Sequence, residues 1–131
     1  MRARIARHRA RRGPAWTTVE EPLALASLLR ELARGGRPVL IDCLTLWLAN
    51  VLEAGRPADA EIDALLAAAS SPAGPVVMVA NEVGLGIVPE NPLARAFRDY
   101  AGRLNQEIAS RAERVVFVAA GLPLVLKDGA R

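Results

Sequence analysis

Three short apolar runs alternate along the chain with segments of helical periodicity. The runs occupy residues 38–43, 75–80 and 114–120. Apolar runs of this length without polar alternation are typical of strands buried on both faces of a parallel sheet. Strands that alternate with helices imply a sheet covered by those helices. The pattern therefore predicts an α/β fold with a mostly parallel sheet flanked by helices.

The segments between the runs carry apolar residues at steps of three and four, the spacing of one helical face. Asn91 is a good N-cap and Pro92 suits the first helical position, so the longest helix begins there. Gly121 is expected to close the third strand. Helices are predicted over residues 23–33, 44–52, 59–69 and 91–112, with a basic helix over 1–12 and a short extended piece over 16–19.

The length and composition indicate one folded domain spanning residues 1–131. Of these residues 52% are hydrophobic and 24% are charged, which supports a buried core and argues against disorder. No run approaches the roughly 18 apolar residues of a membrane span, and no signal peptide is visible. The single cysteine, Cys43, excludes an internal disulfide and a cysteine-rich zinc site. We expect a soluble cytoplasmic domain.

The charge is distributed unevenly. Residues 1–12 contain six arginines and no acid, which gives this segment a charge of +6. The total net charge is +3, so the remaining residues carry −3. The basic segment could face nucleic acid, a phosphate-bearing ligand or an acidic neighbour. Nucleic-acid binding is indicated by this segment alone, and the affinity of such binding would fall steeply with salt.

The carboxyl ends of parallel strands are where ligands bind in open α/β sheets. Here those ends carry Asp42, Asn81 with Glu82, and Gly121. Asp42 is placed like a carboxylate that holds Mg²⁺ on a nucleotide, although it could instead cap the helix that begins at Leu44. Glu82 could equally be an ordinary loop carboxylate.

His8 lies among arginines, which are expected to lower its pKa and keep the imidazole neutral at pH 7. A neutral imidazole beside phosphate-binding cations is suited to attack phosphorus, but a histidine on a basic helix could simply be solvated. The arginines at 9–12 could likewise be a charged face or a phosphate clamp. Trp16 and Trp47 are expected to pack rather than to stack on bases. The sequence contains no GxxxxGK[S/T] phosphate loop, and its only lysine is Lys127.

Several segments together carry a resemblance to a known family. They read RIARHR from residue 4, WTTVEEP from 16, DCLTLWLAN from 42, NEVGLGIVPEN from 81, ARAFRDYAGRLNQ from 94 and AGLPL from 120. This set resembles the bifunctional adenosylcobinamide kinase / adenosylcobinamide-phosphate guanylyltransferase of cobalamin biosynthesis. The NEVGLGIVPEN segment is long and specific, so a chance match is remote.

The resemblance implies two reactions. A nucleoside triphosphate, GTP or ATP, phosphorylates the aminopropanol hydroxyl of adenosylcobinamide, with Mg²⁺ as the expected metal. GMP then moves from GTP onto that phosphate through a guanylylated histidine, giving adenosylcobinamide-GDP and pyrophosphate. The resemblance also implies a P-loop NTPase-like (RecA-like) fold and a homotrimer, with no nucleic-acid partner. It assigns guanylyl acceptance to His8 and nucleotide binding to Arg9, Ala10, Arg11, Arg12, Glu20 and Asp42.

The sequence departs from this family at its start. Family members begin with a strand and a glycine-rich GKS phosphate loop, and neither is found in residues 1–131. We therefore expect an N-terminally truncated, partial nucleotide-binding domain that binds GTP weakly and lacks cobinamide kinase activity. The alternative is a catalytically inactive fragment that acts only by packing against other chains.

Overall fold

The computed structural model describes residues 13–129. The four predicted helices that fall within this range are confirmed, each with ends within two residues of the predicted ones. The basic helix expected over 1–12 lies outside the described residues. The elements are α2 (Leu25–Ala33), β1 (Val39–Asp42), α3 (Leu44–Glu53), α4 (Ala58–Ala69), β2 (Val76–Val79), α5 (Pro92–Arg111), β3 (Arg114–Ala119) and β4 (Leu122–Asp128).

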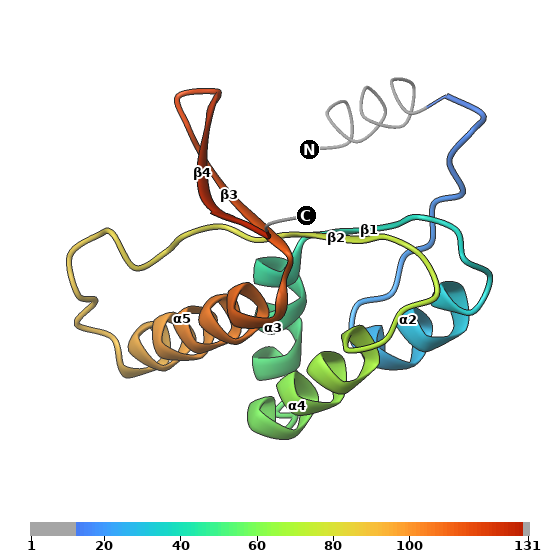
Figure 1. Ribbon diagram of the computed structural model, residues 1–131. Coiled ribbons are helices and arrows are strands. Elements are labelled where there is room, and N and C mark those ends of the chain that lie inside the picture. The colour runs from blue at the N-terminus through green and yellow to red at the C-terminus, as the bar shows by residue number, and fades with distance from the viewer. Residues whose placement is uncertain (1–12, 130–131) are drawn as a thin grey trace.

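β1 and β2 form a parallel pair, as the two apolar runs predict. Their register places Val39 opposite Val76 and Asp42 opposite Val79. The four helices lie on one side of this pair (Figure 1). The chain is therefore α/β, with a small parallel sheet and, separately, a small antiparallel one.

The third apolar run corrects the predicted topology. It forms β3, but β3 pairs antiparallel with β4 and not in parallel with β2. Ala120 and Gly121 both have positive φ, 52° and 77°, which is the backbone of a tight two-residue hairpin turn. Gly121 therefore closes the third strand as predicted, but the turn leads the chain back into β4, a strand that the sequence pattern did not predict.

The prediction that the strands are buried on both faces is also wrong. Ile41 is buried, whereas Leu40 and Val77 are 42% and 56% exposed. The reason is that the helices cover one face of β1 and β2, and nothing in the described part of the chain covers the other (Figure 1). Every residue of β4 is exposed as well.

The core lies among the helices, beneath the covered face of the sheet. Trp47 is buried there, and its indole N–H donates to the Leu23 carbonyl at 3.0 Å, so its predicted packing role is confirmed. Trp16 is 49% exposed, so its predicted packing role is wrong, and residues 16–19 form no strand. The largest fully buried side chains are those of Leu29, Leu44, Leu48, Val51, Ile62, Leu65 and Leu104.

Candidate functional site

The carboxyl ends of β1 and β2 lie side by side. Asp42 ends β1 opposite Val79, and Asn81 follows just after β2. The Asn81 amide N–H donates to the Thr45 hydroxyl at 2.7 Å, which ties the segment after β2 to the first turn of α3. Asp42 and the Asn81–Glu82 segment therefore share one edge, as predicted. Gly121 does not join them, because it lies in the turn of the separate β3–β4 hairpin.

Asp42 does not occupy the helix-capping position. The N-cap of α3 is Cys43, whose side chain makes no capping hydrogen bond. Asp42 is one residue earlier, at the end of β1, and is exposed. The capping interpretation is therefore wrong, and the carboxylate stands at the sheet edge where ligands of α/β folds bind.

The loop between β2 and α5 is held by two arginines of α5. The Arg98 guanidinium donates to the Gly84 carbonyl at 3.0 Å, and that of Arg95 donates to the carbonyls of Pro89 and Glu90. Sequence reasoning missed both arginines. Their spacing of three residues on one helical face was the available signal.

Both ends of this loop are also fixed by side chains. Glu82 accepts a hydrogen bond from the Gly84 amide at 2.7 Å. Asn91 caps α5 as predicted, accepting from the amides of Leu93 at 2.8 Å and Ala94 at 3.3 Å. The loop is therefore tied down along its length by contacts to backbone groups.

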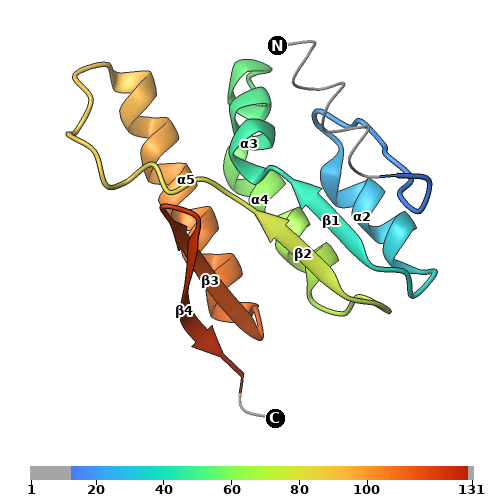
Figure 2. The same cartoon turned by 90° about the horizontal axis from the view of Figure 1, so that it is seen from above.

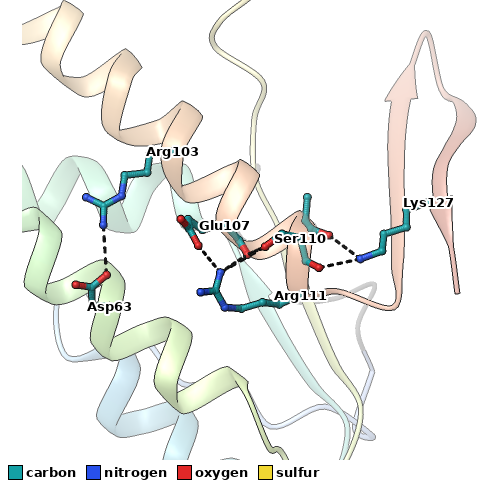
Figure 3. Close-up of polar contacts among 7 residues, drawn as sticks. Asp63, Arg103, Glu107, Ser110, Arg111 and Lys127 are labelled. Carbon is teal, nitrogen blue, oxygen red and sulfur yellow. Dashed lines mark hydrogen bonds and ion pairs between the residues drawn. The ribbon is translucent and has the colours of Figure 1, made fainter.

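An open groove of about 500 Å³ lies between this loop and α5. Asn105 on its wall donates to the Asn81 carbonyl at 3.4 Å, so the groove begins at the edge that carries Asp42. Arg103, also on the wall, pairs with Asp63 of α4 at 3.3 Å (Figure 3) and with Asp59. Its lining residues are Glu82, Gly84, Arg98, Asp99, Gly102, Arg103, Asn105 and Gln106.

Glu20 lies in the extended segment that leads into α2. The Asn50 side chain donates to the Pro22 carbonyl at 3.3 Å, and Trp47 donates to that of Leu23, so this segment is anchored on α3. The neighbouring Glu21 accepts hydrogen bonds from the amides of Leu23 at 2.9 Å and Ala24 at 2.7 Å, which lower the pKa of its carboxyl group. Glu20 therefore lies two residues before the anchored Pro22, and Asp42 lies two residues before the first residue of α3.

The other predicted site residues, His8, Arg9, Ala10, Arg11 and Arg12, lie outside the described residues. Within residues 13–129, no group of three or more His, Cys, Asp or Glu side chains could hold a metal ion. No helix in the same part of the chain is long and apolar enough to cross a membrane.

Comparison with known proteins identifies the family. Residues 1–126 match the CobU family, described as cobinamide kinase / cobinamide phosphate guanyltransferase. The bifunctional adenosylcobalamin biosynthesis protein CobP of Pseudomonas aeruginosa is 53% identical over 129 residues, which are 97% of this chain and 75% of that protein. The CobU proteins of Escherichia coli and Salmonella typhimurium are 39% and 38% identical, over 97% of this chain and 78% of theirs. The chain therefore belongs to the cobinamide kinase / cobinamide phosphate guanyltransferase family, as the resemblance predicts.

Proposed function

We propose that this chain catalyses guanylyl transfer from GTP to adenosylcobinamide phosphate, with His8 as the covalent acceptor. The observation that carries the proposal is the family match over residues 1–126, which includes His8 and the arginines after it. Of the family's two reactions, the proposal concerns guanylyl transfer, because residues 8–12 combine a histidine nucleophile with cations that can bind phosphates. A P-loop NTPase-like fold is part of the same proposal.

The transfer proceeds in two displacements at the α-phosphorus of GTP. First, an imidazole nitrogen of His8 attacks, the P–N bond forms, the bond to the β-phosphate oxygen breaks and pyrophosphate leaves. Then a phosphate oxygen of adenosylcobinamide phosphate attacks the same phosphorus. The new P–O bond forms, the P–N bond breaks, and adenosylcobinamide-GDP is released with the imidazole restored.

The remaining predicted residues bind and orient the nucleotide. The Arg9, Arg11 and Arg12 guanidinium groups neutralise triphosphate charge and stabilise charge that develops on the leaving pyrophosphate. Ala10 lies between them and contributes backbone groups. Glu20 completes the GTP site from the segment anchored on α3.

Asp42 suits a magnesium ion that arrives with the nucleotide. Mg²⁺ is usually held by one or two carboxylates together with substrate phosphates and water, so one exposed carboxylate at the sheet edge fits this donor set. When bound, the ion would neutralise phosphate charge. In this proposal Asp42, the last residue of β1, would hold the ion.

Labelled GTP tests the proposal directly, because His8 is the only histidine in the chain. The folded chain, incubated with Mg²⁺ and a high concentration of GTP, should take label from the α-phosphate and not from the γ-phosphate. The bond should be acid-labile and base-stable, as a phosphoramidate is. His8→Ala should abolish the label without changing the circular dichroism spectrum. A folded chain that takes no label would favour the inactive-fragment alternative.

The resemblance also supports a homotrimer. Large apolar side chains stand exposed on the β3–β4 hairpin, including Val118, Leu122, Leu124 and Leu126. Such a surface is typical of contacts between chains. Sedimentation equilibrium should give a mass three times that of the chain, and a monomer would contradict this part of the proposal.

A further inference from the structure

The loop between β2 and α5 presents apolar side chains to solvent. Ile87 is 97% exposed and Leu85 79%, and Val88 and, in the first turn of α5, Leu93 are exposed as well. We call these four residues the apolar loop. Figure 2 shows this segment running from the end of β2 to the start of α5. Clustered exposed apolar side chains of this size usually mark a binding surface.

The apolar loop is held in place rather than left free. Arg98 and Arg95 donate to the backbone carbonyls of Gly84, Pro89 and Glu90, on both sides of the apolar positions. A surface fixed in this way needs little further ordering when a ligand binds, which favours affinity.

The neighbouring groove is polar but carries no net charge. Glu82 and Asp99 are balanced by Arg98 and Arg103, and Arg103 is already paired with two aspartates of α4. A polyphosphate requires an excess of cations, so this groove is unsuited to the GTP triphosphate. Asn105 and Gln106 add groups that both donate and accept, which suits neutral carboxamides.

The groove adjoins the edge where phosphate chemistry is proposed. Asn105 bonds to Asn81, and Asn81 bonds to Thr45 three residues after Asp42. A substrate in the groove could therefore extend its reactive end toward Asp42 while its body remains on the loop side. This is the arrangement that a large acceptor substrate requires.

We propose that the groove and the apolar loop together bind the corrinoid body of cobinamide and cobinamide phosphate. The inference rests on the proposed function, which makes a cobinamide the acceptor. A corrin ring has broad, methyl-bearing apolar faces and a rim of primary carboxamide chains. The apolar loop covers a ring face, and the groove residues exchange hydrogen bonds with the carboxamides. Small-molecule sites combine apolar surface with a few placed polar groups in the same way.

Equilibrium dialysis against dicyanocobinamide, followed by the corrin's visible absorbance, tests this inference on the folded chain. Ile87→Glu should weaken binding about tenfold or more, because it places a charge against the ring, and its full exposure makes the substitution harmless to folding. Gln106→Ala should weaken binding a few-fold by removing one carboxamide partner. Leu32→Glu is the matched control, an exposed leucine on α2, and should bind like the parent chain.

The outcomes separate this inference from the proposed function. A parent chain that takes no GTP label but loses dicyanocobinamide binding in Ile87→Glu refutes guanylyl transfer and supports the corrinoid site. Unchanged binding in Ile87→Glu, or no binding by the folded parent chain, overturns the inference whatever the labelling shows. If Ile87→Glu binds dicyanocobinamide normally but has an altered sedimentation mass, the apolar loop is a contact between copies of the chain. If it binds dicyanocobinamide normally but takes less GTP label, the apolar loop is part of the nucleotide site.

Discussion

The Asn81 amide donates to the Thr45 hydroxyl at 2.7 Å, and this bond joins the end of β2 to the start of α3. Thr45 is three residues after Asp42, and Asn81 opens the segment that leads to the groove. The bond therefore couples the proposed metal-binding carboxylate to the proposed corrinoid site.

Replacing the Thr45 hydroxyl should loosen that coupling. Thr45→Val keeps the shape of the side chain but leaves the Asn81 amide without its acceptor, which should cost about 1 kcal/mol of unfolding free energy. Urea unfolding followed by circular dichroism measures this. Thr45→Ser retains the hydroxyl and should stay close to the parent, and equal losses in both variants would contradict the role of the bond.

Asp42→Asn should separate function from stability. The substitution removes the charge that Mg²⁺ requires but keeps a similar shape at an exposed position, so unfolding free energy should change by less than about 1 kcal/mol. GTP labelling of His8 should fall by about a hundredfold. Asp128→Asn, an exposed carboxylate on β4, is the control and should label normally. Normal labelling of Asp42→Asn would remove the residue from the site.

Lys127 caps the carboxyl end of α5 from the neighbouring hairpin. Its ammonium group donates to the carbonyls of Ala109 at 3.1 Å and Ser110 at 2.9 Å (Figure 3), where the helix dipole favours a cation. Lys127→Met should lower unfolding free energy by about 1 kcal/mol. Lys127→Arg keeps the charge, so its unfolding free energy should fall by less. Thermal unfolding of both variants measures the two losses.

Ala120 has a φ of 52°, in the left-handed region that costs a side chain about 1 kcal/mol. Ala120→Gly removes the Cβ and should therefore stabilise the hairpin, by several tenths of a kcal/mol after the entropy of the unfolded glycine is subtracted. Ala119→Gly, one residue earlier in β3, has no such strain to relieve and should destabilise it. Amide hydrogen exchange of β3 and β4 reports both effects.

Glu21 should make stability depend on acid pH. Amide bonds from Leu23 and Ala24 lower the pKa of its carboxyl group in the folded chain. The stabilisation is thus complete above the unfolded pKa of about 4.5 and is lost as pH falls through the folded value. The difference in Tm between the parent and Glu21→Gln should be largest at neutral pH and shrink below about pH 4.5.

Glu31→Gln is the control for this pH dependence, since it removes the same charge farther along α2. A Tm difference between the parent and Glu21→Gln that stays constant from neutral to acid pH would show that the bonds from Leu23 and Ala24 do not stabilise the ionised carboxylate.

The sequence by itself determined the four helices within residues 13–129, the parallel pairing of β1 with β2, the cap at Asn91 and the family. Helical spacing, capping and short apolar runs are local properties, so they can be read without knowing which segments meet. The assignments of His8 and of residues 9–12 remain predictions from the family resemblance. Only the tertiary structure decided that β3 pairs with β4, because an apolar run does not specify its partner, and a positive φ at Ala120 is not expected of an alanine. The open sheet face, the Arg95 and Arg98 contacts and the groove likewise arise from segments far apart in the sequence, whose packing no local pattern encodes.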